Sequence, residues 1–396
     1  MRLKQFPTGN QISIDKLANN PYPLFQALLA DEPITYVPAF NMWMVPRRED
    51  VIAILRDADT FTMEPPAGQI NPMEALFGPM MLSMDGPEHK RIRDVFQEPF
   101  RPKHVRTFYQ ELISEIVDQL VADMVGEDVV DLTAVFSDKL AILTVVATLG
   151  LDVNDIRTFR DWYDAFGSAI GNIQGNPDVA QAGAAAFQTF EALIVAQIEA
   201  LRKRPNSSVL SEIIHNPHDQ LDTAQIVSNC ALTFFGGVET TTSMISNALW
   251  CLLTYRDAWE KMVERPSLLT NGLEETMRFE TAVQSAMRFP TRDVTLHGVE
   301  IKTGAKIYCM LGAANRDPRM FAEPDRFDPL RTNANKHLSF AYGPHFCFGA
   351  PLARQEALIG IRKLIQQFPK MRLHSAHLTR PVGHEFRSPP HLYVEL

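Results

Sequence analysis

The chain has 396 residues, of which 45% are hydrophobic and 21% charged, so it holds enough apolar material for a large core. Its formal net charge of -9 at pH 7 argues against a nucleic-acid-binding protein, because such proteins are usually basic. The four cysteines are widely spaced and form no CxxC pair, which argues against a zinc site or a dithiol redox motif and is typical of a reducing cytosol.

The N-terminal part of the chain predicts short elements and one long loop. Residues 1–17 contain no apolar run, and no stretch of about 18 apolar residues follows, so we expect neither a leader peptide nor a membrane anchor. We predict a helix over 23–31 and hairpin strands within ITYVPAFNMWMV, residues 34–45. Residues 62–86 are rich in Pro, Gly and Met, which indicates a long, adaptable and functional loop.

Helical periodicity dominates the middle of the chain. Residues 222–255 form one helical pattern, which at 1.5 Å per residue would run about 50 Å. We therefore predict a mainly α protein with small β-sheets, and length alone would suggest two or three domains. The β-rich part is expected roughly over 33–60, 283–312 and 370–396, and the helical part over 87–280 and 350–367.

The stretch FAYGPHFCFG, residues 340–349, surrounds Cys347 with glycines and aromatic rings. The helix predicted just after the cysteine offers free N–H groups and a positive dipole end, which favour a thiolate. Gly343 and Gly349 permit close backbone approach, and the rings exclude water. One thiolate cannot hold zinc alone, but it can bind a haem iron from one side. The alternative is a buried core cysteine, the interpretation that we give to the other three.

The spacing F-x-x-G-x-H-x-C-x-G resembles the haem-binding signature of the cytochrome P450 family, the haem-thiolate monooxygenases. Phe340, Gly343, His345, Cys347 and Gly349 satisfy it. The resemblance implies that Cys347 is the metal ligand of a haem b (iron protoporphyrin IX). It also implies a single domain over residues 1–396 with the cytochrome P450 fold of the soluble bacterial members, in which the haem lies between the long central helix and the cysteine loop.

The centre of the 222–255 pattern reads FFGGVETTT. Gly236 and Gly237 each cost about 1 kcal/mol relative to alanine inside a helix, so the helix needs room or a bulge there. Glu239 and Thr240 follow, and an acid–alcohol pair facing a groove can relay protons to a ligand. A kinked helix with an exposed acid and a back-bonded threonine is the alternative. The resemblance to the family's G-G-x-[ED]-T assigns Glu239 and Thr240 to proton delivery and Gly236 to the haem contact.

Further polar residues match the family's haem contacts. His89 and Arg93 are four residues apart and share a helical face. An arginine fork meets a carboxylate at two points, which suits a haem propionate. The resemblance extends this role to Arg288 and His345, and for Arg288 a plain surface arginine is the alternative.

An E-x-x-R pair precedes the cysteine loop. Glu275 and Arg278 share a helical face, and alone they would be an exposed ion pair worth well under about 1 kcal/mol. The family joins this pair to an arginine in a downstream P-E-R-F-like segment, and here PDRF makes Arg326 the match. The resemblance implies that the trio holds the cysteine loop, which is a structural role.

The reaction implied by the resemblance is the insertion of one oxygen atom of O2 into a small or medium hydrophobic substrate. Hydroxylation is the expected form, with O-demethylation and epoxidation as alternatives. A peroxide-driven peroxygenase and a non-catalytic haem-thiolate ligand-binding protein stay open, although the acid–threonine pair argues against the peroxygenase. The candidate substrate contacts are Leu82, Phe234, Val283, Ser285 and Phe386.

No Rossmann G-x-G-x-x-G or phosphate loop is present, so electrons must come from another protein. We expect a ferredoxin or flavodoxin with an NAD(P)H-dependent reductase. A basic cluster in 101–106 and Arg354 would attract an acidic donor. The chain is expected to be a cytoplasmic monomer without nucleic-acid or membrane partners.

Overall fold

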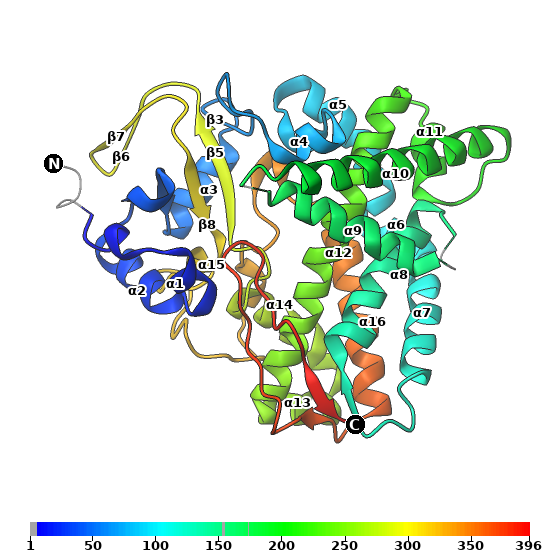
Figure 1. Cartoon of the computed structure of the whole chain (residues 1–396). Helices are drawn as coiled ribbons and strands as arrows, with labels where there is room; N and C mark the ends of the chain where they lie inside the picture. Colours follow the sequence, from blue (N-terminus) through cyan, green and yellow to red (C-terminus); the bar gives the residue numbers. More distant parts are fainter. Residues whose placement is uncertain (1–5, 153–154, 173) are drawn as a thin grey trace.

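The helices of the computed structural model, which describes residues 6–152, 155–172 and 174–396, pack around one long central helix, α12 (Thr223–Thr254). In Figure 1 the β-rich part and the N-terminal helices lie on the left, and the helical bundle lies on the right. A helix that is apolar nearly all round belongs in a core, and α12 is buried along most of its length. The predicted mainly α fold with small sheets is confirmed.

The boundaries of the long helices agree closely with the sequence pattern. Asp222 and Gln225 form a capping box at the start of α12, which explains why the helix begins where its polar flank ends. The predicted helices over 23–31 and 350–367 correspond to α2 and α16. The other helices are α1 (Ile14–Asn19), α2 (Tyr22–Asp31), α3 (Arg48–Arg56), α4 (Pro72–Phe77), α5 (Gly86–Gln97), α6 (Pro102–Phe108), α7 (Gln110–Ala122), α8 (Asp138–Leu149), α9 (Ile156–Ile170), α10 (Pro177–Lys203), α11 (Val209–Ile214), α13 (Arg256–Glu264), α14 (Leu269–Phe279), α15 (Leu311–Ala314) and α16 (Ala350–Gln367).

The largest sheet joins the N-terminal hairpin to strands from the second half of the chain. Its order is β1-β2-β8-β5-β3, with β2 and β8 parallel and the other pairs antiparallel. The predicted hairpin in residues 34–45 is confirmed, and Asn41 takes the left-handed conformation that its turn requires. The strands are β1 (Thr35–Val37), β2 (Met42–Val45), β3 (Phe61–Thr62), β5 (Ser285–Pro290) and β8 (Ile307–Met310).

Two smaller sheets complete the β part. The strands β4 (Val129–Asp131), β10 (Tyr393–Glu395) and β9 (Arg372–Leu373) pair in that order, and β6 (Val294–Leu296) pairs with β7 (Val299–Ile301). The strand β4 interrupts the range 87–280, which the periodicity predicted as helical throughout. That strand is only three residues long, and its partner β10 lies at the other end of the chain, so no local pattern marks it.

The prediction of one long loop over 62–86 is wrong in part. Residues 72–77 form α4, and a 3-10 turn follows over Met81–Ser83. The side chain of Asn71 accepts a hydrogen bond from the N–H of Met73, and Pro72 occupies the first helical position. An Asn-Pro start of this kind is a helix signal, which the Pro, Gly and Met content of the segment concealed.

The helix α10 is the one element in the described residues that is long and apolar enough for a membrane span by length and composition. Its most apolar window has a mean hydropathy of 1.3 and is 17% buried. It packs along α9 and also contacts α4, α11 and α12, so in this fold it is a helix of the bundle.

Candidate functional site

The loop that carries Cys347 is tightened by backbone hydrogen bonds just before α16. The N–H of Cys347 donates to the carbonyl of Phe340 at 3.0 Å. Gly343 has a φ of +74°, and a Cβ there would lie 2.2 Å from the carbonyl oxygen of Leu55, so no other residue fits. A Cβ at Gly349 would lie 3.7 Å from the sulfur. The loop geometry therefore requires Gly343, whereas a Cβ at Gly349 would make only an ordinary contact with the sulfur.

The surroundings of the Cys347 sulfur favour a metal-bound thiolate. Cys347 is exposed at the surface of its loop. Desolvation by the surrounding atoms raises the pKa of its thiol, and the N–H groups of Gly349 and Ala350 and the charges of Arg93 and Arg354 offset this rise only in part. Donors and cations aimed at a sulfur stabilise its negative charge once a metal has displaced the proton. The other three cysteines are buried, as predicted, and burial raises the pKa of Cys230 to about 12.

Two histidines and an arginine converge beside this loop. The rings of His89, from α5, and His345 stack at 4.2 Å between centroids and 27° between planes. Arg93 donates to the carbonyl of Phe346. His89 is 4% exposed, and its Nε2 atom has no hydrogen-bond partner. Burial, with the charges of His345 and Arg93, lowers the pKa of His89 to about 4. A carboxylate would satisfy this orphaned nitrogen and the neighbouring cation.

Arg288 is buried on β5, so the alternative of a plain surface arginine is wrong. Its side chain is 2% exposed and donates to the carbonyl of Met287 at 2.7 Å. Within the described residues it forms no ion pair, and burial lowers its pKa. A buried guanidinium needs a counter-ion, and an anionic group bound nearby would supply it.

Asp85, which the sequence pattern did not single out, fixes His345. Its Oδ1 atom lies 2.8 Å from Nε2 of His345, and Thr62 and the N–H of Met63 donate to its other oxygen. Burial would raise the pKa of Asp85, but the hydrogen bonds from His345 and Thr62 outweigh it and lower the value to about 2. The residue ties the 62–85 segment to the cysteine loop. Its position just before α5 is the only local signal.

The helix α12 is continuous through its glycine pair, and there is open space beside the first glycine. Gly236 is exposed, and a Cβ there would meet nothing within 4 Å, whereas a Cβ at Gly237 would lie 3.1 Å from Val145 on α8. The Thr240 hydroxyl donates to the carbonyl of Gly236 at 2.6 Å. Glu239 is not a free surface acid, because the hydroxyl of Tyr163 on α9 donates to it. The alternative interpretation of this segment was a kinked helix with an exposed acid and a back-bonded threonine. The structure has the back-bonded threonine, but the acid accepts a hydrogen bond from a neighbouring helix.

Comparisons with known proteins agree with this arrangement. The family model described as Cytochrome P450 matches residues 154–377. The chain belongs to the cytochrome P450 family. Among curated cytochromes P450, it is 31% identical to the biotin biosynthesis cytochrome P450 of Bacillus subtilis over 89% of this chain and 90% of the relative. It is also 31% identical to the vitamin D(3) 25-hydroxylase of Pseudonocardia autotrophica over 89% and 88%.

The structure of P450BioI in complex with hexadec-9Z-enoic acid-ligated acyl carrier protein superposes with a TM-score of 0.87 at 30% identity. The match covers 97% of this chain and 100% of that chain. As a cytochrome P450, the protein is a monooxygenase and an oxidoreductase with haem b as its cofactor.

The residues present fit the haem of a cytochrome P450. The orphaned nitrogen of His89 and the buried charge of Arg288 are groups that the carboxylates of a haem would satisfy. Gly236 leaves space on α12, and donors surround the Cys347 sulfur. Cys347 would hold the iron, and His89, Arg93, Arg288 and His345 would hold the propionates.

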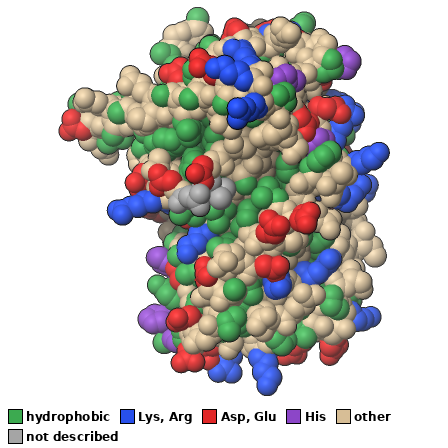
Figure 2. All heavy atoms as spheres, turned by 90° about the vertical axis from the view of Figure 1, so that its right-hand side faces the viewer, with side chains coloured by type: hydrophobic (Ala, Val, Ile, Leu, Met, Phe, Trp, Pro, Cys, Tyr) green, Lys and Arg blue, Asp and Glu red, His purple; other side chains and the backbone are tan. Residues whose placement is uncertain are grey.

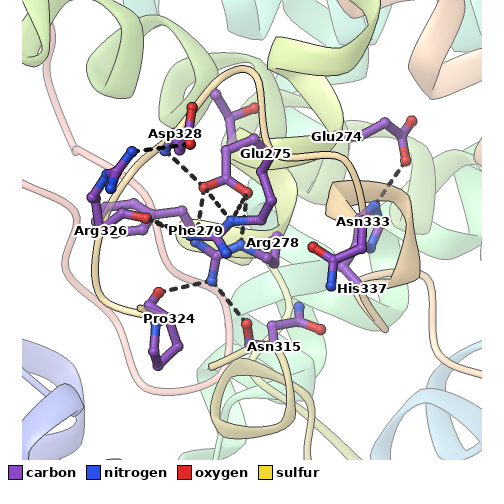
Figure 3. A network of polar contacts seen from close by, with 12 residues as sticks. Glu274, Glu275, Arg278, Phe279, Asn315, Pro324, Arg326, Asp328, Asn333 and His337 are labelled. Atoms are coloured by element: carbon purple, nitrogen blue, oxygen red, sulfur yellow. Dashed lines mark hydrogen bonds and ion pairs between the residues drawn. The ribbon is translucent and has the colours of Figure 1, made fainter. Parts of the chain in front are cut away.

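A buried ion-pair network below the cysteine loop corresponds to the family's E-x-x-R, and Figure 3 shows it. The side chains of Glu275 and Arg278 are both 0% exposed and lie 2.7 Å apart. Arg278 also donates to the carbonyls of Asn315 at 3.0 Å and Pro324 at 2.8 Å. Because both charges are fully enclosed, this is not the weak exposed pair that the spacing alone allows.

The third member of this network is Arg331 and not Arg326. Nε of Arg331 lies 3.1 Å from Glu275, and this side chain is 9% exposed. The Arg326 guanidinium pairs with Glu323 at 2.9 Å and with Asp328, and it is 59% exposed. The turn at 323–326 directs the carbonyl of Arg326 towards Arg278 and its side chain outwards, as the close view shows.

Glu274, the neighbour of this pair, holds the other side of the loop. It accepts hydrogen bonds from Arg354 at 2.6 Å and from His337 at 3.1 Å. The Arg354 guanidinium lies over the ring of Phe340 at 4.4 Å. Helix α14 therefore contacts the residues on either side of the cysteine loop through Glu274, and holds the segment further upstream through Glu275.

The pH dependence of stability should report the Glu274 contacts. Burial would raise the pKa of Glu274, but the hydrogen bonds from His337 and Arg354 lower it from 4.5 to about 2. Because the pKa of Glu274 is lower in the folded state than in the unfolded state, its ionised form stabilises the fold at pH values above 4.5. This stabilisation is lost as the pH falls towards 2. Wild type should lose roughly 3 kcal/mol through this group over that range. Guanidinium unfolding at a series of pH values should give Glu274→Gln a shallower acid slope, with the exposed Glu264→Gln as control. Equal slopes in all three proteins would contradict the assignment.

The five predicted substrate contacts fall into two groups. Leu82 is half-buried, and Val283 forms a β-bridge with Phe386, whose side chain is 39% exposed, so these three can still border a pocket. Phe234 cannot, because it is 0% exposed. It packs against an aromatic cluster on the side of α12 away from Gly236, made of Phe159, Phe166 and Phe190.

Ser285 does not face the haem side either. Alternate residues of a strand point to opposite faces, which separates Ser285 from Arg288 on β5. The Ser285 hydroxyl donates to the Glu385 carboxylate at 3.0 Å. Tyr308 donates to the same carboxylate at 2.8 Å, so this polar group is internally satisfied.

Proposed function

We propose that this cytochrome P450 inserts one oxygen atom of O2 into a C–H bond of a small or medium hydrophobic substrate, with electrons from a separate protein. The observation that supports this proposal is the acid–alcohol pair on α12. Glu239 and Thr240 follow Gly236, beside which there is open space. The Glu239 carboxylate accepts a hydrogen bond from Tyr163, and the Thr240 hydroxyl donates one to the Gly236 carbonyl, so both side chains are held in place. A peroxygenase needs no such pair, because peroxide brings its own protons and electrons.

Each residue has a role that its contacts allow. Haem, when bound, supplies the oxygen-activating chemistry, and a thiolate ligand favours O–O cleavage. The Thr240 hydroxyl hydrogen is committed to the Gly236 carbonyl, so its oxygen is left to accept a hydrogen bond on the open side. One oxygen of the Glu239 carboxylate makes a weak contact with the Ser243 hydroxyl, at 3.4 Å. Because this contact is weak, that oxygen can take a proton and pass it on.

The substrate class is inferred from the candidate pocket and from the relatives. Leu82, Val283 and Phe386 offer apolar surface, and we propose that a hydrophobic molecule contacts them. The names of the relatives mention vitamin D(3), biotin biosynthesis and a hexadec-9Z-enoic acid ligated to a carrier protein, which are consistent with apolar substrates. Screening compounds for a spin-state change in the haem spectrum would narrow the class.

The electron donor is proposed to be a ferredoxin or flavodoxin with an NAD(P)H-dependent reductase, docking behind the cysteine loop. A cleft of about 280 Å³ lies there between α6, α12, α14 and α16. The basic cluster is weaker than predicted, because Arg101 pairs with Glu98 and His104 with Glu212, which leaves Lys103 and Arg106. The face in Figure 2, which is the right-hand side of the view in Figure 1, carries acidic and basic side chains side by side, so that face has no single-sign field. We also propose a cytoplasmic monomer.

One reconstitution distinguishes the candidate functions. Purified protein is given a hydrophobic substrate that changes its spin state, air, and electrons from a ferredoxin with its reductase. The proposal expects an oxygenated product that depends on electrons. Product formed with peroxide alone, but not with electrons, would favour a peroxygenase. Binding without any product under either condition would favour a ligand-binding protein.

A further inference from the structure

The acid of the α12 pair is held from a neighbouring helix. The Tyr163 hydroxyl, from α9, donates to one oxygen of Glu239, and Ser243 donates to the other oxygen at 3.4 Å. The tyrosine contact joins residues 76 positions apart in the chain. It is the stronger of the two, because the Ser243 contact is longer than the usual O–H···O hydrogen bond.

The ring of Tyr163 is held by two contacts. One face stacks on Phe235 of α12, with 5.3 Å between centroids and 21° between planes. The Arg160 guanidinium lies 5.3 Å from the ring centroid. Tyr163 is 7% exposed, so its hydroxyl has a defined direction. Burial and the Glu239 carboxylate raise the pKa of Tyr163, and the phenol therefore remains a donor and keeps its own proton.

A group of charges continues from Tyr163 to the surface. Arg160 pairs with Asp164 on its own helix at 2.9 Å and with Asp138 at the start of α8. The side chains of Arg160, Asp164 and Asp138 are 41%, 54% and 20% exposed, so the group reaches solvent. Burial raises the pKa of Asp138, and the nearby charge of Glu239 acts in the same direction.

We propose that Tyr163 is the positioning residue for Glu239, holding its carboxylate from α9, where the ring of Tyr163 lies beside the solvent-exposed Arg160–Asp164–Asp138 cluster. This inference rests on the proposed function, because the position of Glu239 matters only if that residue delivers protons. It assigns to α9 a part in the reaction that the motif on α12 does not contain.

The test compares Tyr163→Phe with a matched control, Tyr36→Phe. Each variant loses one tyrosine hydroxyl hydrogen bond, to Glu239 in the first case and to Asn41 at 2.6 Å in the distant hairpin in the second. The first readout is the infrared carboxylate stretch of Glu239 in the resting protein, identified as the band missing from Glu239→Gln. The second is the fraction of consumed electrons recovered in product.

Tyr163→Phe should shift the Glu239 band and lower the electron fraction in product about tenfold, the effect of one lost hydrogen bond to a charged group. Substrate affinity should stay unchanged, and Tyr36→Phe should resemble wild type in every readout. An unshifted band, or electron use equal to that of Tyr36→Phe while Glu239→Gln is impaired, would overturn the inference. If Glu239→Gln itself used electrons as well as wild type, the proposed function of Glu239 would fail, and this inference with it.

Discussion

Replacing Thr240 with alanine is expected to leave haem and substrate binding intact while diverting most of the consumed electrons into hydrogen peroxide. The Thr240 hydroxyl donates to the Gly236 carbonyl, and its oxygen faces the open side of α12. Alanine removes that oxygen but is the best helix former, so the helix should persist. Removing one proton-transfer group lowers the rate of the catalysed step by about 100-fold or more. Electron consumption, product and peroxide, measured together, give the result.

Two variants bracket the Thr240 experiment. Thr240→Ser keeps the hydroxyl and should restore a large part of the product yield. Thr241→Ala changes the adjacent threonine, which is buried at 4% exposure, and should leave the partition of electrons unchanged. Product formation by Thr240→Ala at the wild-type yield, or equal diversion of electrons in Thr241→Ala, would count against the role of Thr240.

Replacing Glu275 with glutamine should be the most destabilising of these changes. The carboxylate is 0% exposed and meets two guanidinium groups, those of Arg278 and Arg331. Its loss leaves two enclosed positive charges without a counter-ion, and breaking a buried ion pair costs about 3–5 kcal/mol. We expect a lower denaturation midpoint and weaker haem retention, because the network supports the segment before the cysteine loop. Guanidinium unfolding followed by haem absorbance measures both.

The same experiment tests the placement of the third arginine. Arg331→Gln should cost several times more stability than Arg326→Gln, because the Arg326 side chain is 59% exposed and exposed pairs contribute at most about 1 kcal/mol. Equal costs in the two variants would contradict the assignment of Arg331 to the Glu275 network.

The parts of this protein that the sequence predicted well are those with a local signal. Helices α12 and α16 have long apolar periods and clear polar flanks, so their boundaries agree to within one residue. The hairpin at 34–45 alternates around a turn at Asn41. The cysteine loop was recognised because its glycines and aromatic residues occupy fixed spacings. Each of these patterns lies within a single stretch of chain.

The parts that were missed depend on contacts between distant segments. Tyr163 reaches Glu239 across 76 positions, and Asp85 reaches His345 across 260. Arg326 was preferred to Arg331 because the motif lies in PDRF, whereas the fold turns that side chain outwards. Phe234 lies two residues before Gly236, about 200° around the helix, a difference that the apolar content of the segment concealed.

The central claim is that Cys347 is the thiolate ligand of the haem iron, and the carbon monoxide spectrum of the reduced protein tests it most directly. Wild type should show the strongly red-shifted band that a thiolate ligand produces, and Cys347→His should bind haem but lack this band. Survival of the red-shifted band in Cys347→His, or wild-type protein that purifies without haem from cells supplied with haem precursors, would contradict the claim.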